Sequence, residues 1–421
     1  MTVKPRDSAE HSASPPVPRT TGRIIGLDGA RGLSAVGVAV MHVAGNFSPN
    51  TAAQTKIGIV GMSLIFFFVL SGFLLFLPYV RRLTEDASAA TAPSARNFAI
   101  HRIARILPGY LVIFLLCNYV FAVVYVENPT VQTIGTSEGT GTITDPWQLL
   151  ANLTLLQTYI PKYIFTGLNP SWSLTLEFAF YASLPLSAVL LFALRRRTSV
   201  RPLRLAASLP VAFIVLGFVG KLLLPLVSNH FGVTDPELMQ WGPNWVSVYL
   251  RSFLVNADNF AFGMLAAVVV VAIEQGAVRR SVARRVRPAA ALALPVVLAV
   301  SFALIALGDM FGTSGMALAS ALVILVIVAP LSCGQRSRIG EGLELTPFLF
   351  VGKVSLSLYL LHFPTMLMLH RFGLLAGDSL GGMCLNIVVV LAVTLIVSGV
   401  TYYTVEKPAM DIARRYRYRW R

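Results

Sequence analysis

Apolar stretches of about twenty residues recur along the whole chain and constrain its fold more than any other feature. About 20 consecutive apolar residues cross a bilayer as an α-helix. Only 13% of the residues are charged, against roughly 25% in soluble domains. The sequence therefore predicts an all-α, polytopic integral membrane protein with about ten transmembrane helices around a central polar cavity. We expect these helices near residues 24–45, 57–80, 103–126, 171–194, 206–228, 247–273, 289–308, 313–332, 348–370 and 383–405.

The basic residues are distributed unevenly among the connecting segments. The formal net charge is +15, and 27 of the 34 Lys and Arg residues fall in tails and loops on one side of the predicted membrane. The loops of the other side hold Lys56, Lys162 and Arg371. Because basic loops remain in the cytoplasm, the sequence predicts a multi-pass protein of the cell membrane with both termini cytoplasmic. The same distribution favours contacts with anionic lipids of the bilayer over nucleic-acid binding.

Composition divides the chain into three parts. Residues 1–23 are rich in Pro, Ser and charge without an apolar run, which is typical of a disordered cytoplasmic tail. Residues 24–408 carry all the apolar segments and form one membrane domain. Residues 409–421 are expected to form a short basic cytoplasmic tail, so any extracytoplasmic partner would be a separate protein.

Common soluble-enzyme motifs do not explain the chain. It has no Walker A loop, HExxH or dinucleotide fingerprint, and its three cysteines lack paired spacing, so we expect no metal site. "GTSEG" (135–139) fits G-x-S-x-G, but this motif needs a preceding strand and a following helix. Its place in a polar loop argues against a nucleophilic serine.

The first apolar segment contains two ionisable residues, Arg31 and His42, eleven positions apart. On an α-helix this spacing corresponds to about 1100° and about 16 Å, which puts both side chains within roughly 20° of one face. Ionisable groups at that depth cost several kcal/mol unless they face a polar interior, and they usually mark a functional site or pathway. The alternative is that Arg31 snorkels to the inner interface and His42 reaches the outer one.

Several short sequence blocks lie in and after this segment. "GLDGARG" (26–32) contains Arg31, which is followed by ten residues and then His42. The further blocks are "FFFVLSGFLL" (66–75), "HRIARILPGY" (101–110), "SWSLTLEFAFY" (171–181), "NFAFGMLAA" (259–267), "GKVSLSLYLLHFP" (352–364) and "VEKP" (405–408). In this order the blocks resemble the acyltransferase 3 family of membrane O-acyltransferases. The resemblance covers residues 24–408, nearly the whole chain.

The resemblance implies transfer of an acyl group, usually acetyl, from cytoplasmic acyl-CoA to a hydroxyl of a carbohydrate or glycosylated acceptor. A hydroxyl needs a base to become a good nucleophile, and neutral imidazole can take its proton at working pH. We therefore assign His42 as the general base. Glu177 is the candidate for orienting the imidazole and stabilising its charged form. The alternative for Glu177 is a structural pair with an arginine.

Arginine suits the phosphates of the donor because its planar fork donates two parallel hydrogen bonds. Arg102 and Arg105 are expected near the donor entrance and Arg31 deeper along its route, although topology alone explains Arg102 and Arg105 almost equally well. Where relatives carry two adjacent arginines, this chain has His101 and Arg102, which leaves the strength of phosphate binding open. Further candidate substrate-binding residues are Ser71, Trp172, Ser173, Tyr359 and His362, and Glu406 is expected to pair with a basic loop.

A second class of function also accounts for ionisable residues among many helices. A secondary transporter or flippase for a glycan or lipid intermediate would carry them along its pathway. Such proteins usually consist of two related halves with matching broken helices, and the sequence shows no convincing internal repeat. The resemblance favours the enzyme.

Overall fold

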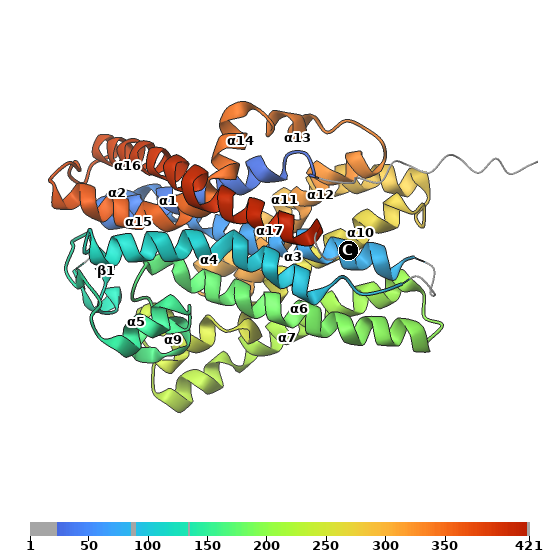
Figure 1. Cartoon of the computed structure of the whole chain (residues 1–421), viewed down its shortest axis with the longest axis horizontal. Coiled ribbons are helices and arrows are strands. Elements are labelled where there is room, and N and C mark those ends of the chain that lie inside the picture. Colours follow the sequence, from blue (N-terminus) through green and yellow to red (C-terminus); the bar gives the residue numbers. More distant parts are fainter. Residues whose placement is uncertain (1–22, 86–89, 134, 419–421) are drawn as a thin grey trace, which may run out of the picture.

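The computed structural model describes residues 23–85, 90–133 and 135–418, so all of the tail predicted over residues 1–23 except Arg23 lies outside the described residues. Long helices lie side by side along the long axis of the molecule (Figure 1). In the described part of the chain the strands are limited to β1 (Val124–Tyr125) and β2 (Thr140–Gly141), which pair antiparallel with Val124 opposite Gly141. The all-α prediction is confirmed.

Within the described residues, eight helical segments are long and apolar enough to cross a membrane. The number rises to nine if two helices joined at a bend are counted as one span. α1 (Leu27–Phe47) is a further 21-residue helix, and it is less hydrophobic because it carries Asp28, Arg31 and His42. The protein is therefore a polytopic membrane protein. The eight segments are Ile57–Leu83 with α3 (Leu64–Leu83), α4 (Ala95–Tyr119), Asn169–Arg197 with α6 (Trp172–Arg197), α7 (Pro202–Phe231), Trp245–Glu274 with α10 (Phe253–Glu274), α11 (Arg280–Ala306), α12 (Phe311–Ser332) and Leu380–Arg415 with α16 (Leu380–Thr401).

The helix predicted at residues 348–370 is broken in the structure. It consists of α14 (Thr346–Lys353) and α15 (Ser355–Arg371), which meet at an angle of 74°. A Cβ atom added to Gly352 would lie 2.2 Å from the carbonyl oxygen of Asp28, so only glycine allows α14 to approach α1 so closely. Helical periodicity does not show a bend that depends on a contact with a distant segment.

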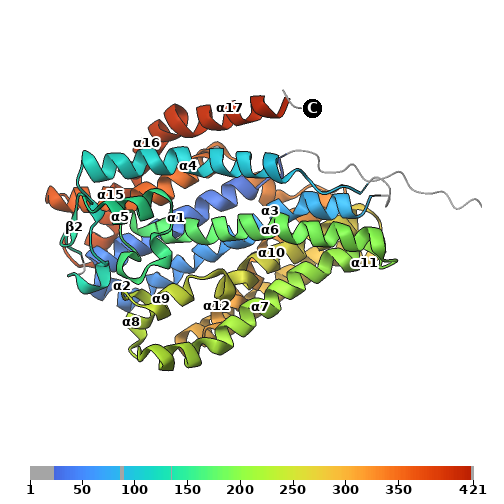
Figure 2. The same ribbon diagram turned by 60° about the horizontal axis from the view of Figure 1, so that its bottom comes forward.

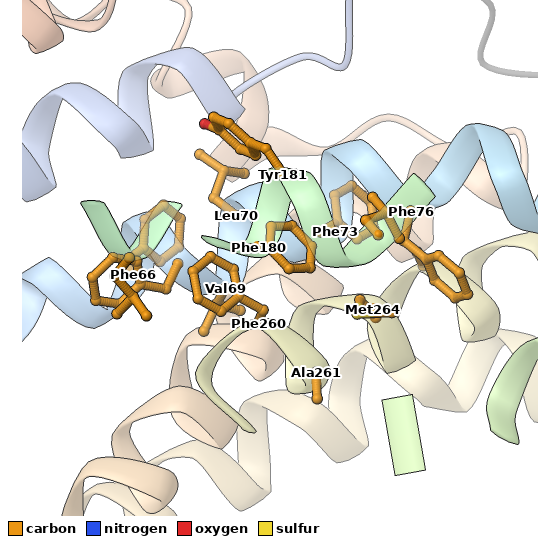
Figure 3. Close-up of a cluster of buried hydrophobic side chains, with 14 of the residues drawn as sticks. Phe66, Val69, Leu70, Phe73, Phe76, Phe180, Tyr181, Phe260, Ala261 and Met264 are labelled. Carbon is orange, nitrogen blue, oxygen red and sulfur yellow. The ribbon is translucent and has the colours of Figure 1, made fainter. Parts of the chain in front are cut away.

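The core is formed by aromatic and aliphatic side chains of α3, α6 and α10. Figure 3 shows Phe66, Phe73 and Phe76 of α3 beside Phe180 of α6 and Phe260 of α10. The rings of Phe180 and Phe260 stack with their centroids 4.2 Å apart. This contact requires small residues nearby, because a Cβ atom on Gly72 would lie 2.0 Å from the carbonyl oxygen of Phe260.

The two ends of the bundle differ in composition. We call one the arginine end, where α3 and α6 finish with Arg81–Arg82 and Arg195–Arg197 and where α11 begins. The other, the loop end, holds β1, β2 and the short helices α2 (Pro49–Thr55), α5 (Pro146–Leu153), α8 (Pro236–Trp241) and α9 (Trp245–Leu250) (Figure 1). This segregation agrees with the charge pattern of the sequence.

The described part of the predicted basic tail at residues 409–421 is helical. α16 continues through a π-helical turn, η6 (Tyr402–Glu406), into α17 (Lys407–Tyr418). α17 lies against α4 on the outside of the bundle (Figure 2). Ser137 of the "GTSEG" segment lies in the loop before β2, so a strand and not a helix directly follows the segment, which lacks the strand–turn–helix geometry of a nucleophile elbow.

Candidate functional site

A cavity of about 120 Å³ with mostly apolar walls lies among α1, α3, α4, α6 and α15. Seven of the residues proposed from the sequence line it, together with apolar residues of α3. They are Arg31, Ser71, Arg102, Arg105, Ser173 and Glu177, with Tyr359 at the α15 wall. We call this space the donor cavity below, after the acyl donor that the sequence analysis expects Arg31, Arg102 and Arg105 to bind. Helices that are distant in sequence thus bring three cations and one carboxylate into one apolar-walled space.

Glu177 is held in this cavity by two hydroxyl groups. The Ser71 hydroxyl donates to Oε1 at 3.1 Å, and the Tyr181 hydroxyl donates to Oε2 at 2.9 Å. Tyr181 follows Glu177 by one helical turn on α6, and Ser71 comes from α3. No ion pair of Glu177 is present among the described residues, so the alternative of a structural arginine pair does not describe its position.

Arg31 lies where the broken helix meets α1. Its Nη2 donates to the carbonyl of Gly352 at 2.8 Å and lies 2.9 Å from Oδ1 of Asp28, while its Nε donates to the Ser355 hydroxyl at 3.1 Å. The bend between α14 and α15 leaves the Gly352 carbonyl available to this guanidinium. Arg31 therefore closes one wall of the cavity and also stabilises the break.

Arg102 and Arg105 occupy different electrostatic surroundings although both line the cavity from α4. Arg105 lies 3.5 Å from Oε2 of Glu406, a fully buried carboxylate at the end of η6 that also accepts a hydrogen bond from Ser357. Arg102 forms no ion pair with any described residue. The expected partner of Glu406 is thus a basic residue, but one inside a helix rather than in a loop. Of these two arginines, Arg102 is therefore the one more available to bind an external anion.

His42 pairs with a second histidine, not with Glu177. Its Nδ1 lies 2.9 Å from Nε2 of His362, which is fully buried, and the two rings stack with centroids 5.1 Å apart. Nδ1 of His362 lies 3.3 Å from the carbonyl oxygen of Leu358. The partner expected for His42 is therefore corrected: Glu177 is bonded to Ser71 and Tyr181 instead.

Tyr359 connects the histidine pair to the donor cavity. It lines the cavity, and its ring centroid lies 6.0 Å from that of His362 and 5.9 Å from that of Phe67. Its hydroxyl interacts with Ser173 at 2.8 Å and donates to the Pro170 carbonyl at 3.0 Å, which fixes the ring against the start of α6. Neither His42 nor His362 lines the cavity itself, so Phe67 and Tyr359 form its boundary on the histidine side.

Trp172 lies apart from this cavity and contacts Arg251, a residue that the sequence did not bring to attention. The Arg251 guanidinium lies 4.6 Å from the ring centre of Trp241, 4.8 Å from Phe165 and 5.3 Å from Trp172. Such stacking between a guanidinium and aromatic faces holds segments together. Trp172 therefore anchors the loop end, and sequence alone gives no sign of this cluster because its members lie on four separate segments.

Comparison with known proteins identifies the family. The acyltransferase domain model of the acyltransferase 3 family matches residues 24–403. The acyltransferase MdmB of Streptomyces mycarofaciens is 27% identical over 423 residues, covering 95% of each chain. No solved structure matches significantly. With a family match over almost the entire membrane domain, the chain belongs to the acyltransferase 3 family and is a membrane acyltransferase.

Proposed function

We propose that this protein is an O-acyltransferase that uses acyl-CoA, with acetyl as the acyl group, and acylates a hydroxyl of a carbohydrate or glycosylated acceptor. The observation that carries the proposal is the pairing of His42 with His362 next to a cavity lined by arginines. The cations match the phosphates of the donor, and the imidazole matches the need of a hydroxyl for a base. The basic loops support an arrangement in which the arginine end faces the cytoplasm.

The hydrogen bonds of the two histidines support Nε2 of His42 as the basic nitrogen. A carbonyl oxygen only accepts, so the contact with Leu358 requires the proton of His362 on Nδ1. Nε2 of His362 is then bare and accepts from Nδ1–H of His42. In this arrangement Nε2 of His42 carries the free lone pair. His362 is thus a positioning residue that selects the tautomer of His42, as a third group does in hydrolytic triads.

The proposed reaction proceeds by direct transfer. The acceptor oxygen attacks the thioester carbonyl carbon while its proton moves to Nε2 of His42. The carbon–sulfur bond breaks, an ester forms, and the proton passes from the imidazolium to the departing thiolate. Arg102 and Arg31 hold the donor from the arginine end, and the acyl arm passes the boundary formed by Phe67 and Tyr359 to reach the histidine.

The experiment measures release of CoA thiol from acetyl-CoA by the purified protein, with a panel of envelope polysaccharides and glycosides as acceptors. We expect His42→Ala to lower the rate by about 10²–10⁴-fold, the usual contribution of a general base. His230→Ala is the matched control, because His230 is an exposed histidine of α7 outside the cavity. Full activity of His42→Ala would contradict the proposal.

A second arm tests His362. Glutamine can accept a hydrogen bond from His42 Nδ1–H through its side-chain oxygen, whereas leucine cannot. We therefore expect His362→Gln to retain more of the kcat than His362→Leu, with little change in KM for acetyl-CoA. Equal kcat values for the two variants, or equal pH profiles for both and for the unchanged protein, would mean that His362 serves packing alone.

A further inference from the structure

Two further cavities lie at the arginine end, between α11, α12 and α13 (Arg338–Gly342). One, of about 420 Å³, is walled on its apolar side by Ala283, Pro288 and Ala291 of α11 and by Ala329 and Pro330 of α12. The other, of about 520 Å³, is lined by Arg287, Arg336, Arg338 and Glu341. Arg287 borders both, so the two form one groove, which we call the α11–α12 groove. The small side chains of its wall leave the space open.

The groove carries a net positive charge. Arg336 is neutralised by Glu341, with Nε–Oε1 and Nη2–Oε2 distances of 2.8 and 3.1 Å. Arg284, Arg287 and Arg338 also border it and form no ion pair with any described residue. Exposed Arg284 and Arg287 therefore border the cavity that has the apolar wall, and exposed Arg338 borders the adjoining cavity. This combination matches a ligand with an anionic head and an apolar tail.

The groove also lies at the boundary of the apolar part of the bundle. The first turns of α11 hold Arg280, Arg284, Arg285 and Arg287, and the helix is apolar from Pro288 onward. α12 is apolar up to Leu331 and ends at Ser332. Both helices change from apolar to polar at the same level, which is where the phosphate of a membrane lipid lies relative to its acyl chains.

We propose that the α11–α12 groove binds an anionic phospholipid, with its phosphate among Arg284, Arg287 and Arg338 and its acyl chain against the alanine and proline wall. None of these residues lines the donor cavity, so the site is separate from the acyl-transfer chemistry. Basic pockets between transmembrane helices are known binding sites for lipid headgroups. The proposal does not depend on the acyl donor or on the role of His42.

The test is native mass spectrometry of the full-length protein in detergent, titrated with phosphatidylglycerol or with phosphatidylcholine. We expect tighter binding of phosphatidylglycerol. In Arg284→Gln/Arg287→Gln that affinity should fall by roughly 30-fold, because each arginine near an anionic lipid surface raises the affinity about fivefold. A second variant, Ala291→Trp, fills the apolar wall without changing charge and should weaken binding of the same lipid.

The matched control is Arg196→Gln/Arg197→Gln, which removes two exposed arginines of α6 at the same end of the bundle but outside the groove. This variant should bind phosphatidylglycerol like the unchanged protein. Equal binding of both lipids by the unchanged protein, or equal losses in the groove and control variants, would overturn the proposal. Displacement of the lipid by millimolar inorganic phosphate would also overturn it, since the groove would then recognise a free phosphate.

Discussion

Two of the groups of charged side chains inside this bundle lie in different surroundings. On α7, α10 and α12, the Lys221 ammonium lies 2.7 Å from both carboxylate oxygens of Asp258, which also accepts from Ser314 at 2.5 Å. Their side chains are 1% and 0% exposed, respectively, and neither borders the donor cavity. Arg102 and Glu177 instead border that cavity. A sealed pair acts on stability, whereas charges that border a cavity are available to a substrate.

This contrast explains why depth alone does not identify a functional residue in a membrane protein. Ionisable residues inside the bilayer are functional candidates by default. Lys221 and Asp258 satisfy each other, and Lys221 also donates to the Val255 carbonyl at 3.0 Å, so this pair joins α7 to α10 without leaving room for a ligand. A Cβ atom on Gly217 would lie 2.5 Å from Asp258 Oδ1, so even the neighbouring helix is shaped around the carboxylate.

The largest expected effect concerns the sealed pair. Asp258→Ala leaves the Lys221 ammonium buried and unpaired, which should lower the free energy of unfolding by about 3–5 kcal/mol. The measurement is denaturant unfolding in micelles. The double variant Lys221→Met/Asp258→Leu removes both charges and should regain most of that stability. Retained stability in Asp258→Ala would show that the pair is not sealed from water.

The next effect concerns donor affinity. Arg102→Gln removes the cavity cation that has no carboxylate partner among the described residues, so the KM for acyl-CoA should rise by roughly 10- to 100-fold, as expected for loss of a charged hydrogen bond. The unfolding free energy should stay nearly constant. Arg196→Gln, at an exposed position of α6, is the control. An unchanged KM in steady-state kinetics would remove Arg102 from the donor site.

Two serines provide the most direct comparison of the two groups. Ser314 and Ser71 each donate a hydrogen bond to an internal carboxylate, Asp258 and Glu177 respectively. Ser314→Ala removes one of the two donors to Asp258 Oδ2 in a dry site, the other being Lys221, and should cost about 1–3 kcal/mol of unfolding free energy. Ser71→Ala should cost less than about 1 kcal/mol, because water in the donor cavity can replace the hydroxyl. Equal losses would mean that the cavity is dry.

The smallest effect is expected at an exposed carboxylate in the loop between α15 and α16. Hydrogen bonds from Thr51 and Asn50 at the start of α2 lower the pKa of Asp378. A lowered folded-state pKa gives stability that is complete above the ordinary value of 3.8 and is lost as the pH falls through the folded value. Asp378→Asn should therefore lower Tm slightly at neutral pH. The difference from the unchanged protein should vanish in acid, and a difference that persists there would contradict this linkage.

Several features of the site could be predicted from the sequence because they depend on local spacing. Eleven residues on one helix put Arg31 and His42 on one face, and the structure has both on α1. The family blocks pointed to Ser71, Arg102, Arg105, Glu177 and Tyr359, and these lie together in the donor cavity. Each of these residues lies in a run of its block that belongs to a single helix, so its place on that helix follows from helical periodicity and needs no knowledge of distant contacts.

Other features depend on which helices meet, and the sequence could not give them. His362 is 320 positions from His42, and the expected partner Glu177 bonds Ser71 and Tyr181 instead. The bend between α14 and α15 depends on the approach of Gly352 to α1, and η6 places Glu406 beside Arg105. Arg251 has three aromatic neighbours that lie on separate segments.

The sequence by itself determined that this is a helical membrane protein, which end of the bundle is basic, and which residues share a helix face. Those properties follow from the length, hydrophobicity and 3.6-residue periodicity of single segments. The tertiary structure alone decided which charges are sealed and which border a cavity, and which ring partners His42. Such distinctions depend on the packing of helices hundreds of residues apart, where a hydrogen bond or a void is set by the neighbour and not by the residue itself.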